Sequence, residues 1–155
     1  MHYGSDTMLH FEDLTPGRRF HTASHTLTLA EIRDFAGSFD PQFFHLDEVA
    51  AEDSVFNGLA ASGWHVASLT MRLVVASELS RVAGGLVGMK VDNMRWPRPT
   101  RAGDTLQTEI EVLAQRASAK QPQFGIVTLQ WTTRNQHEEI AVQLETAIWV
   151  KRRDG

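Results

Sequence analysis

The residues with the clearest chemical potential are Asp40 and His45, which stand five positions apart within the stretch 35–65. A proline and two phenylalanines lie between them. A carboxylate beside an imidazole can accept and donate protons near neutral pH, and apolar neighbours that exclude water strengthen the interaction between the two groups. The spacing therefore predicts an acid/base pair for proton transfer.

The first element that would position this pair is a short helix over residues 29–36. Thr28 is followed three residues later by Glu31, which is the pattern of a capping box. Apolar residues then fall on one helical face until Gly37, which we expect to end the helix.

Asp40 and Pro41 repeat the pattern of a helix start, an acidic N-cap before a proline. A further helix is predicted over residues 47–52, and residues 56–58 predict a break. The longest helical pattern follows in residues 60–85 and is apolar around much of its circumference. We expect this long helix to be buried.

Alternating apolar and polar residues predict the strands of an α+β fold. An early strand, bent near Ala23, precedes the helices, and four consecutive antiparallel strands follow them. The predicted ranges are 18–29, 86–97, 105–115, 124–134 and 139–151. This order predicts a curved antiparallel sheet wrapped around the long helix.

The composition of the chain argues against several classes of protein. The chain has 155 residues, a formal charge of −4 and no cysteine. We expect a single domain over residues 1–155, no disulfide or thiolate site, and no attraction to nucleic acid or to a membrane surface. Residues 1–14 have no cationic start before an apolar run, so no secretory signal is expected. A cytoplasmic protein is the simplest expectation.

Four segments together resemble one known family. They are FEDLTPG at 11–17, FAGSFDPQFFHLD at 35–47, LAASGWH at 59–65 and MRWPRPTRAGDTL at 94–106. This order is similar to that of the MaoC-like acyl dehydratases, relatives of the (R)-specific enoyl-CoA hydratases with the hot-dog fold. The most specific part is the acid five residues before the histidine, followed by Leu46 and Asp47.

The resemblance implies that Asp40 and His45 are the catalytic pair, and that the backbone N–H of Gly63 binds a thioester carbonyl oxygen. Ser62, Phe44 and Trp64 would contact the substrate. The substrate would be an acyl-CoA or an acyl carrier protein thioester, with coenzyme A only as part of the substrate and with no metal or other cofactor. The implied reaction is the hydration of a 2-enoyl thioester to the 3-hydroxyacyl thioester, in fatty acid metabolism.

The sequence departs from the common family pattern GDxNPxHxD at three positions. Phe39 precedes the acid, Gln42 stands in place of asparagine, and Phe43 replaces the proline. Ser62 precedes Gly63 where a histidine is frequent. These changes affect the orientation of the pair and the substrate preference.

Structural roles compete with these functional ones. Asp40 could be only a helix cap, His45 a buried polar group, and Gly63 a point of close packing. His45 with Asp47 and Glu48 could form a metal site, although a third histidine is missing. Ser62 and His65 could suggest a serine nucleophile, but the glycine-flanked elbow is absent, and His65 is expected to pack against a helix. 

Arg95, Arg98 and Arg101 form a basic cluster that could bind the phosphates of coenzyme A or could be solvated at a strand end. Phe43 and Phe56 would add to an apolar pocket. The alternative functions are a hot-dog acyl-CoA thioesterase and a non-catalytic acyl-thioester-binding subunit. Because the sheet would have open edges, we expect a homodimer or a dimer of dimers.

Overall fold

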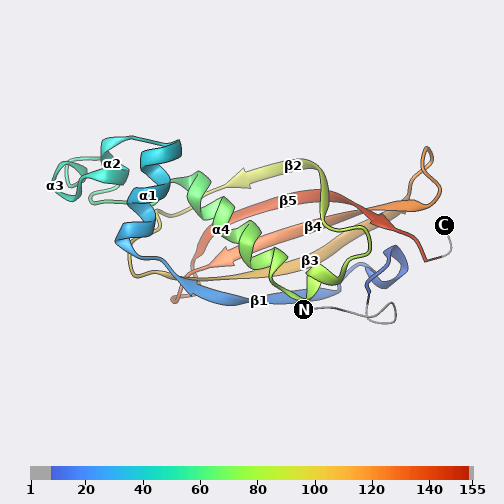
Figure 1. Cartoon of the computed structure of the whole chain (residues 1–155). Coiled ribbons are helices and arrows are strands. Elements are labelled where there is room, and N and C mark those ends of the chain that lie inside the picture. The colour runs from blue at the N-terminus through green and yellow to red at the C-terminus, as the bar shows by residue number, and fades with distance from the viewer. Residues whose placement is uncertain (1–7, 154–155) are drawn as a thin grey trace.

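The computed structural model describes residues 8–153, which contain a five-stranded sheet (Figure 1). The strands are β1 Arg19–Thr26, β2 Val87–Arg95, β3 Thr105–Ala117, β4 Phe124–Arg134 and β5 Ile140–Lys151. Their order in the sheet is β1-β3-β4-β5-β2, and every neighbouring pair is antiparallel. The N-terminal stretch in which no secretory signal is expected includes residues 1–7, which lie outside the described residues.

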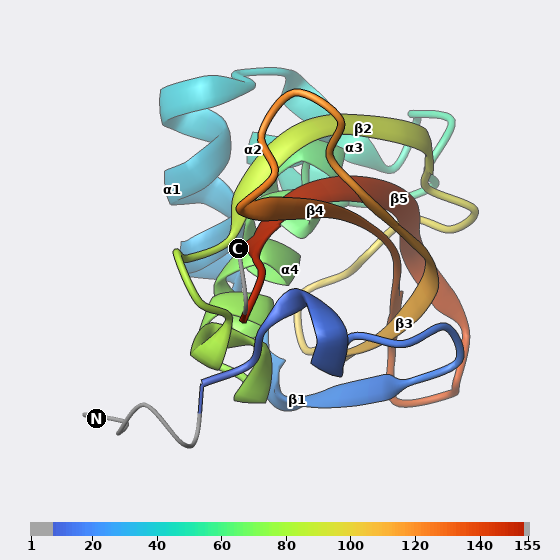
Figure 2. The same cartoon turned by 90° about the vertical axis from the view of Figure 1, so that its right-hand side faces the viewer.

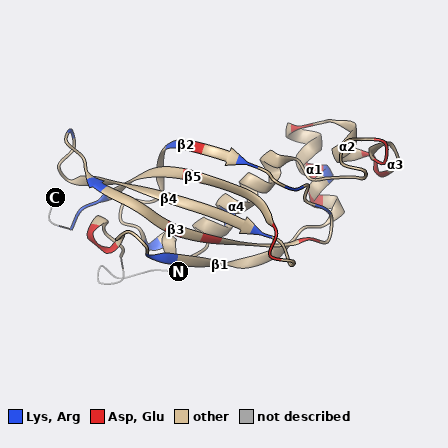
Figure 3. Cartoon of the chain, turned by 180° about the vertical axis from the view of Figure 1, so that it is seen from behind, with Lys and Arg blue, Asp and Glu red and all other residues tan. Residues whose placement is uncertain are grey.

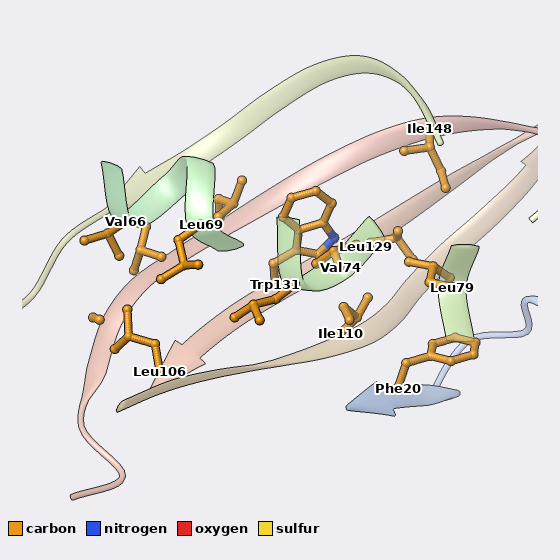
Figure 4. Close-up of a cluster of buried hydrophobic side chains, with 14 of the residues drawn as sticks. Phe20, Val66, Leu69, Val74, Leu79, Leu106, Ile110, Leu129, Trp131 and Ile148 are labelled. Atoms are coloured by element: carbon orange, nitrogen blue, oxygen red, sulfur yellow. The ribbon is translucent and has the colours of Figure 1, made fainter. Parts of the chain in front are cut away.

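The long helix α4, Gly63–Val75, lies in the hollow of this curved sheet (Figure 2). Apolar residues of the helix face the apolar side of the strands, whose side chains alternate between core and solvent, and removal of this surface from water is the main stabilising contribution. Figure 4 shows Val66, Leu69 and Val74 of the helix with Leu106, Ile110, Leu129 and Trp131 of the sheet. The predicted α+β fold, a curved sheet around a buried helix, is therefore confirmed.

A chain of threonine hydroxyls fixes α4 to the sheet. Oγ1 of Thr70 on the helix lies 2.7 Å from Oγ1 of Thr133 on β4, which lies 2.7 Å from Oγ1 of Thr108 on β3. All three side chains are fully buried. Buried hydroxyls need partners, so this chain sets the position of the helix along the sheet as well as its distance from the sheet.

The strand β1 is bent where its pairing with β3 is interrupted, between His21 and Ser24. There the hydroxyl of Thr22 accepts the N–H of Thr108 at 3.0 Å and so replaces a backbone partner. The predicted bend near Ala23 is confirmed.

The helix α1, Leu29–Phe39, begins with the predicted capping box, in which Thr28 and Glu31 exchange hydrogen bonds of 3.1 Å in both directions. The prediction that Gly37 ends this helix is wrong. The helix ends instead at Asp40, whose backbone (φ −153°, ψ 65°) leaves the helical region because the next residue is proline.

Two single-turn helices, α2 Phe43–Leu46 and α3 Glu48–Ala51, complete a cap with α1 beside the N-terminus of α4 (Figure 1). The predicted helix at 47–52 is present, in a shorter form, and the carboxylate of Asp47 caps it by accepting from two backbone N–H groups. The predicted break at 56–58 is confirmed by positive φ angles at Asn57 (53°) and Gly58 (146°).

The predicted helix over 60–85 is too long at both ends. The chain is extended before Gly63 and the α-helix ends at Val75, followed by a short 3-10 helix, η3, Glu78–Arg81. Ser77 causes the interruption, because its hydroxyl donates to the carbonyl of Val74 and accepts from the N–H of Leu79.

The expected run of four consecutive strands is correct for β3, β4 and β5 and wrong for β2. This strand pairs with β5 at the far edge of the sheet rather than with β3. The connection 96–104 carries the chain back across the N-terminal end of α4, where Ala61 N–H donates to the Thr100 carbonyl at 2.8 Å. Alternation of residue types predicts strands but does not predict their neighbours.

Charged residues of both signs are interspersed along the strands and at both ends of the molecule (Figure 3). Arg19 on β1, for example, pairs with Glu109 and Glu111 on β3. Within residues 8–153, none of the helices combines the length and the apolar character that a membrane crossing requires.

Candidate active site

A pocket of about 490 Å³ lies where the cap meets the N-terminus of α4. Its walls come from the cap, from the first turn of α4 and from the connection that follows β2. The lining residues are Asp40, Gln42, Phe44, His45, Phe56, Ala61, Gly63, Trp64, Val66, Trp96, Pro97, Arg98, Pro99 and Thr100. The structure thus brings both members of the predicted acid/base pair, and Gly63, to one cavity.

His45 lies on α2 with only 4% of its surface exposed. Its Nδ1 is 2.6 Å from the carbonyl oxygen of Ala60, and because a carbonyl can only accept, Nδ1 must carry a proton. The other ring nitrogen, Nε2, lies 3.2 Å from Oδ2 of Asp40. A carboxylate and an unprotonated ring nitrogen are both acceptors, so a second proton must lie between them for this contact to be a hydrogen bond.

Asp40 accepts two further hydrogen bonds. The amide of Gln42 donates to Oδ1 at 2.5 Å, and the hydroxyl of Ser62 donates to Oδ2 at 2.7 Å. Burial raises the pKa of Asp40, but the hydrogen bonds from Gln42 and Ser62 and the adjacent His45 lower it, and the pKa lies below its usual value. These contacts stabilise the charged, carboxylate form of Asp40.

The prediction that Asp40 caps a helix N-terminus is wrong. It stands at the C-terminal end of α1, and α2 begins at Phe43 with Gln42 as its N-cap. Its carboxylate is therefore directed to Gln42, His45 and Ser62 rather than to backbone donors of a helix.

Gly63 is the first residue of α4, so its N–H has no acceptor within the helix. The indole of Trp96 lies against its Cα, and a Cβ at this position would be 2.8 Å from that ring. The indole N–H also donates to the Gly63 carbonyl at 2.9 Å. The close-packing role of Gly63 is thus present, and the same packing fixes the backbone of a residue that lines the pocket.

Aromatic rings form the remaining wall near His45. The ring of Phe44 meets that of His45 edge to face at 4.6 Å, and Phe56 packs on Phe44 at 5.2 Å. Trp64 also lines the pocket, with 61% of its surface exposed. Phe43 was expected in the same wall, but it is half exposed, does not line the pocket and packs on the ring of Phe44.

Ser62 was expected to contact the substrate, but it is fully buried and donates to Asp40. This bond also argues against its role as a nucleophile, as does the position of His65, whose ring stacks on Phe35 at 4.7 Å. Burial lowers the pKa of His65. The expectation that His65 packs against a helix is confirmed.

The alternative metal site is not assembled. Asp47 caps α3 and Glu48 pairs with Arg33, while His45 is directed to Asp40. Across residues 8–153, no three His, Asp or Glu side chains gather in a way that could hold a metal ion.

The three arginines of the predicted basic cluster have separate roles. Arg101 donates to the carbonyls of Phe56 and Leu59 and thereby holds the cap loop. Arg95 donates to Gln143. Arg98 lines the pocket, is half exposed and pairs with Glu139 at 2.8 Å.

Sequence reasoning missed two residues of the site, Gln42 and Trp96. Gln42 was noted only as a departure from a family pattern, although an amide two residues after an acid can reach it. Trp96 is far from Gly63 in the sequence, and nothing in the sequence marks their contact.

Comparisons with known proteins show which family the chain belongs to. Residues 11–135 match the family model described as a MaoC like domain. The crystal structure of the MaoC-like dehydratase from Rhodospirillum rubrum is 49% identical, with a TM-score of 0.89 over 94% of this chain and 98% of that one. The uncharacterized protein YdeM of Bacillus subtilis is 32% identical over 91% of this chain and 98% of its own length. The (R)-hydratase from A. caviae, involved in PHA biosynthesis, is 26% identical, with a TM-score of 0.71 over 88% of this chain and 97% of that one. The chain therefore belongs to the MaoC-like domain family and has its hot-dog fold.

Proposed function

We propose that this protein interconverts a 2-enoyl thioester and its 3-hydroxyacyl thioester by the addition and removal of water. One observation carries the proposal. Oδ2 of Asp40 lies 2.7 Å from the hydroxyl of Ser62 and 3.2 Å from Nε2 of His45, in the pocket that Gly63, the first residue of α4, also lines. Membership of the MaoC-like family and the similarity to an (R)-hydratase support this class of reaction.

In the hydration direction, the carboxylate of Asp40 accepts a proton from a water molecule as its oxygen forms a bond to C3 of the substrate. The C2–C3 double bond opens, and its electrons move to the thioester carbonyl oxygen. His45 then gives the proton on Nε2 to C2, and the proton on Asp40 passes to His45 across their contact. The pair returns to its starting state, and the product has gained one water.

The backbone N–H of Gly63 stabilises the negative charge that develops on the carbonyl oxygen. It is the first N–H of a helix, where unpaired donors and the helix dipole favour an anion. Trp96 keeps this backbone in place, because its indole packs on Gly63 and binds the carbonyl of the same residue.

The substrate is an acyl thioester of coenzyme A or of an acyl carrier protein. The rings of Phe44 and Phe56 exclude water from the reacting atoms beside His45. Arg98 is the member of the basic cluster placed to meet a phosphate at the pocket, since it lines the pocket and remains half exposed. The reaction uses no metal or further cofactor.

The protein acts as a homodimer that pairs through β2. This strand lies at the edge of the sheet with Val87, Met89 and Val91 between 41% and 54% exposed. An exposed apolar edge strand favours pairing with another strand. A monomer in light scattering that retains full activity would contradict this assembly.

The test is a panel of 2-enoyl-CoA thioesters of increasing chain length, followed by the loss of absorbance of the conjugated thioester. Free thiol is measured in the same samples. Loss of absorbance without thiol release is the expected result. Thiol release in step with turnover would favour a thioesterase, and heat protection by the thioester without turnover would favour a binding subunit.

A further inference from the structure

A second pocket, of about 430 Å³, lies along the seam between α4 and β2. Its walls are mainly apolar side chains from the helix, from β2 and from the concave face of β4 and β5. The lining residues are Ala67, Met71, Leu86, Gly88, Met89, Lys90, Val91, Met94, Trp131, Leu144, Thr146 and Ile148.

This pocket follows the first one along the same helix face. Gly63 lines the first pocket, whereas Ala67 and Met71, one and two helical turns later, line the second. The helical rise places these two residues about 6 Å and about 12 Å beyond Gly63. On the other side of the seam, Trp96 lines the first pocket and Met94 the second. The two pockets thus follow one another along α4, in the direction that an acyl chain would take from a thioester carbonyl at Gly63.

Two buried polar groups of the second pocket lack partners. The indole N–H of Trp131 and the hydroxyl of Thr146 make no hydrogen bond within residues 8–153, although each residue is only 6% exposed. Other buried hydroxyls of this sheet, those of Thr108 and Thr133, are paired. A buried donor without an acceptor is costly, so an unpaired pair of donors in one cavity calls for a ligand atom.

The two groups lie close together on the sheet. Trp131 on β4 is opposite Leu144 on β5, and Thr146 is opposite Leu129, the next residue of β4 on the same face. Figure 4 shows the ring nitrogen of Trp131 on the side of Leu129. Lys90 also lines the pocket, but its ammonium group pairs with Asp92 at 3.3 Å.

The geometry points to a class of substrate, and this inference rests on the function proposed above. We infer that the preferred substrates are 2-enoyl thioesters of medium chain length that carry an oxygen acceptor, such as a ketone, near the far end of the chain. Trp131 and Thr146 both donate to that oxygen, and the apolar walls contact the carbon chain between. An indole N–H can only donate, so a group that offers only donors does not fit.

The experiment compares two substrates, 2-octenoyl-CoA and the same thioester with a ketone at the penultimate carbon of the chain. The measured quantity is the ratio of their kcat/KM values. Wild type should prefer the ketone by about tenfold or more, because a site built to pair a polar group discriminates against a substrate that lacks it. Thr146→Val removes one donor with little change of shape, and Trp131→Phe removes the other together with one ring of the indole. Each should lower the ratio toward one.

Thr128→Val is the matched control, since Thr128 lies on β4 beside Leu129 and, by strand alternation, faces away from the pocket. It should leave the ratio at the wild-type value. Melting curves identify any variant that fails to fold, and the two donor variants test the inference independently. Efficient turnover of both thioesters at equal kcat/KM, or an unchanged ratio in a folded Thr146→Val, would overturn the inference and leave the hydratase function intact. Turnover of neither substrate would overturn the hydratase function and this inference with it.

Discussion

The two pockets along α4 differ in how their polar side chains are bonded. In the first, the polar atoms of Asp40, His45 and Ser62 are partnered by one another, by Gln42 and by the Ala60 carbonyl. In the second, the donors of Trp131 and Thr146 have no partner among the described residues. A network that is complete before substrate arrives holds reacting groups in place, whereas unpaired donors can be satisfied only by what binds.

The largest loss of activity is expected when the base in the first pocket is removed. Asp40→Asn keeps the shape of the side chain but removes its negative charge, and we expect kcat/KM to fall by about 10²- to 10⁴-fold. The decay of enoyl-thioester absorbance measures it. Asp47→Asn is the matched control, because this nearby acid only caps α3 and asparagine caps as well. Normal activity in a folded Asp40→Asn variant would show that Asp40 is not the base.

The next effect concerns the backbone donor. Gly63→Ala places a methyl group 2.8 Å from the Trp96 indole, so the ring or the helix start must move. We expect a loss of about 1–3 kcal/mol of unfolding free energy and of roughly 10²-fold in kcat/KM. Gly37→Ala is the control, since nothing lies within 4 Å of its added methyl group and α1 should become more stable. Full activity in Gly63→Ala would argue against the amide as a donor to substrate.

A smaller effect is expected when one hydrogen bond to Asp40 in the first pocket is removed. Ser62→Ala removes a hydrogen bond that holds the pKa of Asp40 down, so this pKa should rise. The acid limb of the kcat/KM profile should move to higher pH, with a loss of about tenfold at neutral pH.

The same bond links stability to pH. Because the folded-state pKa of Asp40 is lowered, its contribution to stability is present above its unfolded pKa and is lost as pH falls through the folded value. Denaturant titrations should show a smaller decrease of stability in acid for Ser62→Ala than for wild type. An identical acid limb in both proteins would mean that Ser62 does not act on Asp40.

The smallest effect is expected in the second pocket, where the hydroxyl of Thr146 has no partner among the described residues. Without ligand, Thr146→Val should leave the unfolding free energy unchanged or raise it by up to about 1 kcal/mol, because it replaces an unsatisfied hydroxyl. Thr133→Val should instead lower it by about 1–3 kcal/mol, because it leaves Thr70 and Thr108 without a shared partner. Equal losses in thermal melts of the two variants would mean that Thr146 is bonded after all.

Local patterns in the sequence predicted local structure well. The box of Thr28 and Glu31, the bend near Ala23 and the break at Asn57 each depend on neighbouring residues, and each is present. The pairing of Asp40 with His45 was also predictable, because a few residues separate them. Gly37 failed as a helix end because a glycine permits a stop, while Pro41 imposes one.

What the sequence could not predict depends on contacts between distant segments. Trp96 contacts Gly63, and Thr146 on β5 lies opposite Leu129 on β4, only because the strands have a particular order. Residue alternation carries no information about that order. The position of β2 at the far edge was missed for this reason, and with it the second pocket.

The placement of β2 also has a consequence for biosynthesis. Among the described residues, its strand neighbour in the sheet is β5, which the ribosome makes only after β3 and β4. Until then, β2 has no strand to pair with, and its side chains Val87, Met89 and Val91 remain exposed. Such exposure favours association with other unfinished chains. Sheet closure therefore couples the last part of the chain to the segment just after α4, and such long-range pairing slows folding. The edge that we expect to join two mature subunits thus stays without its partner strand until β5 has been made.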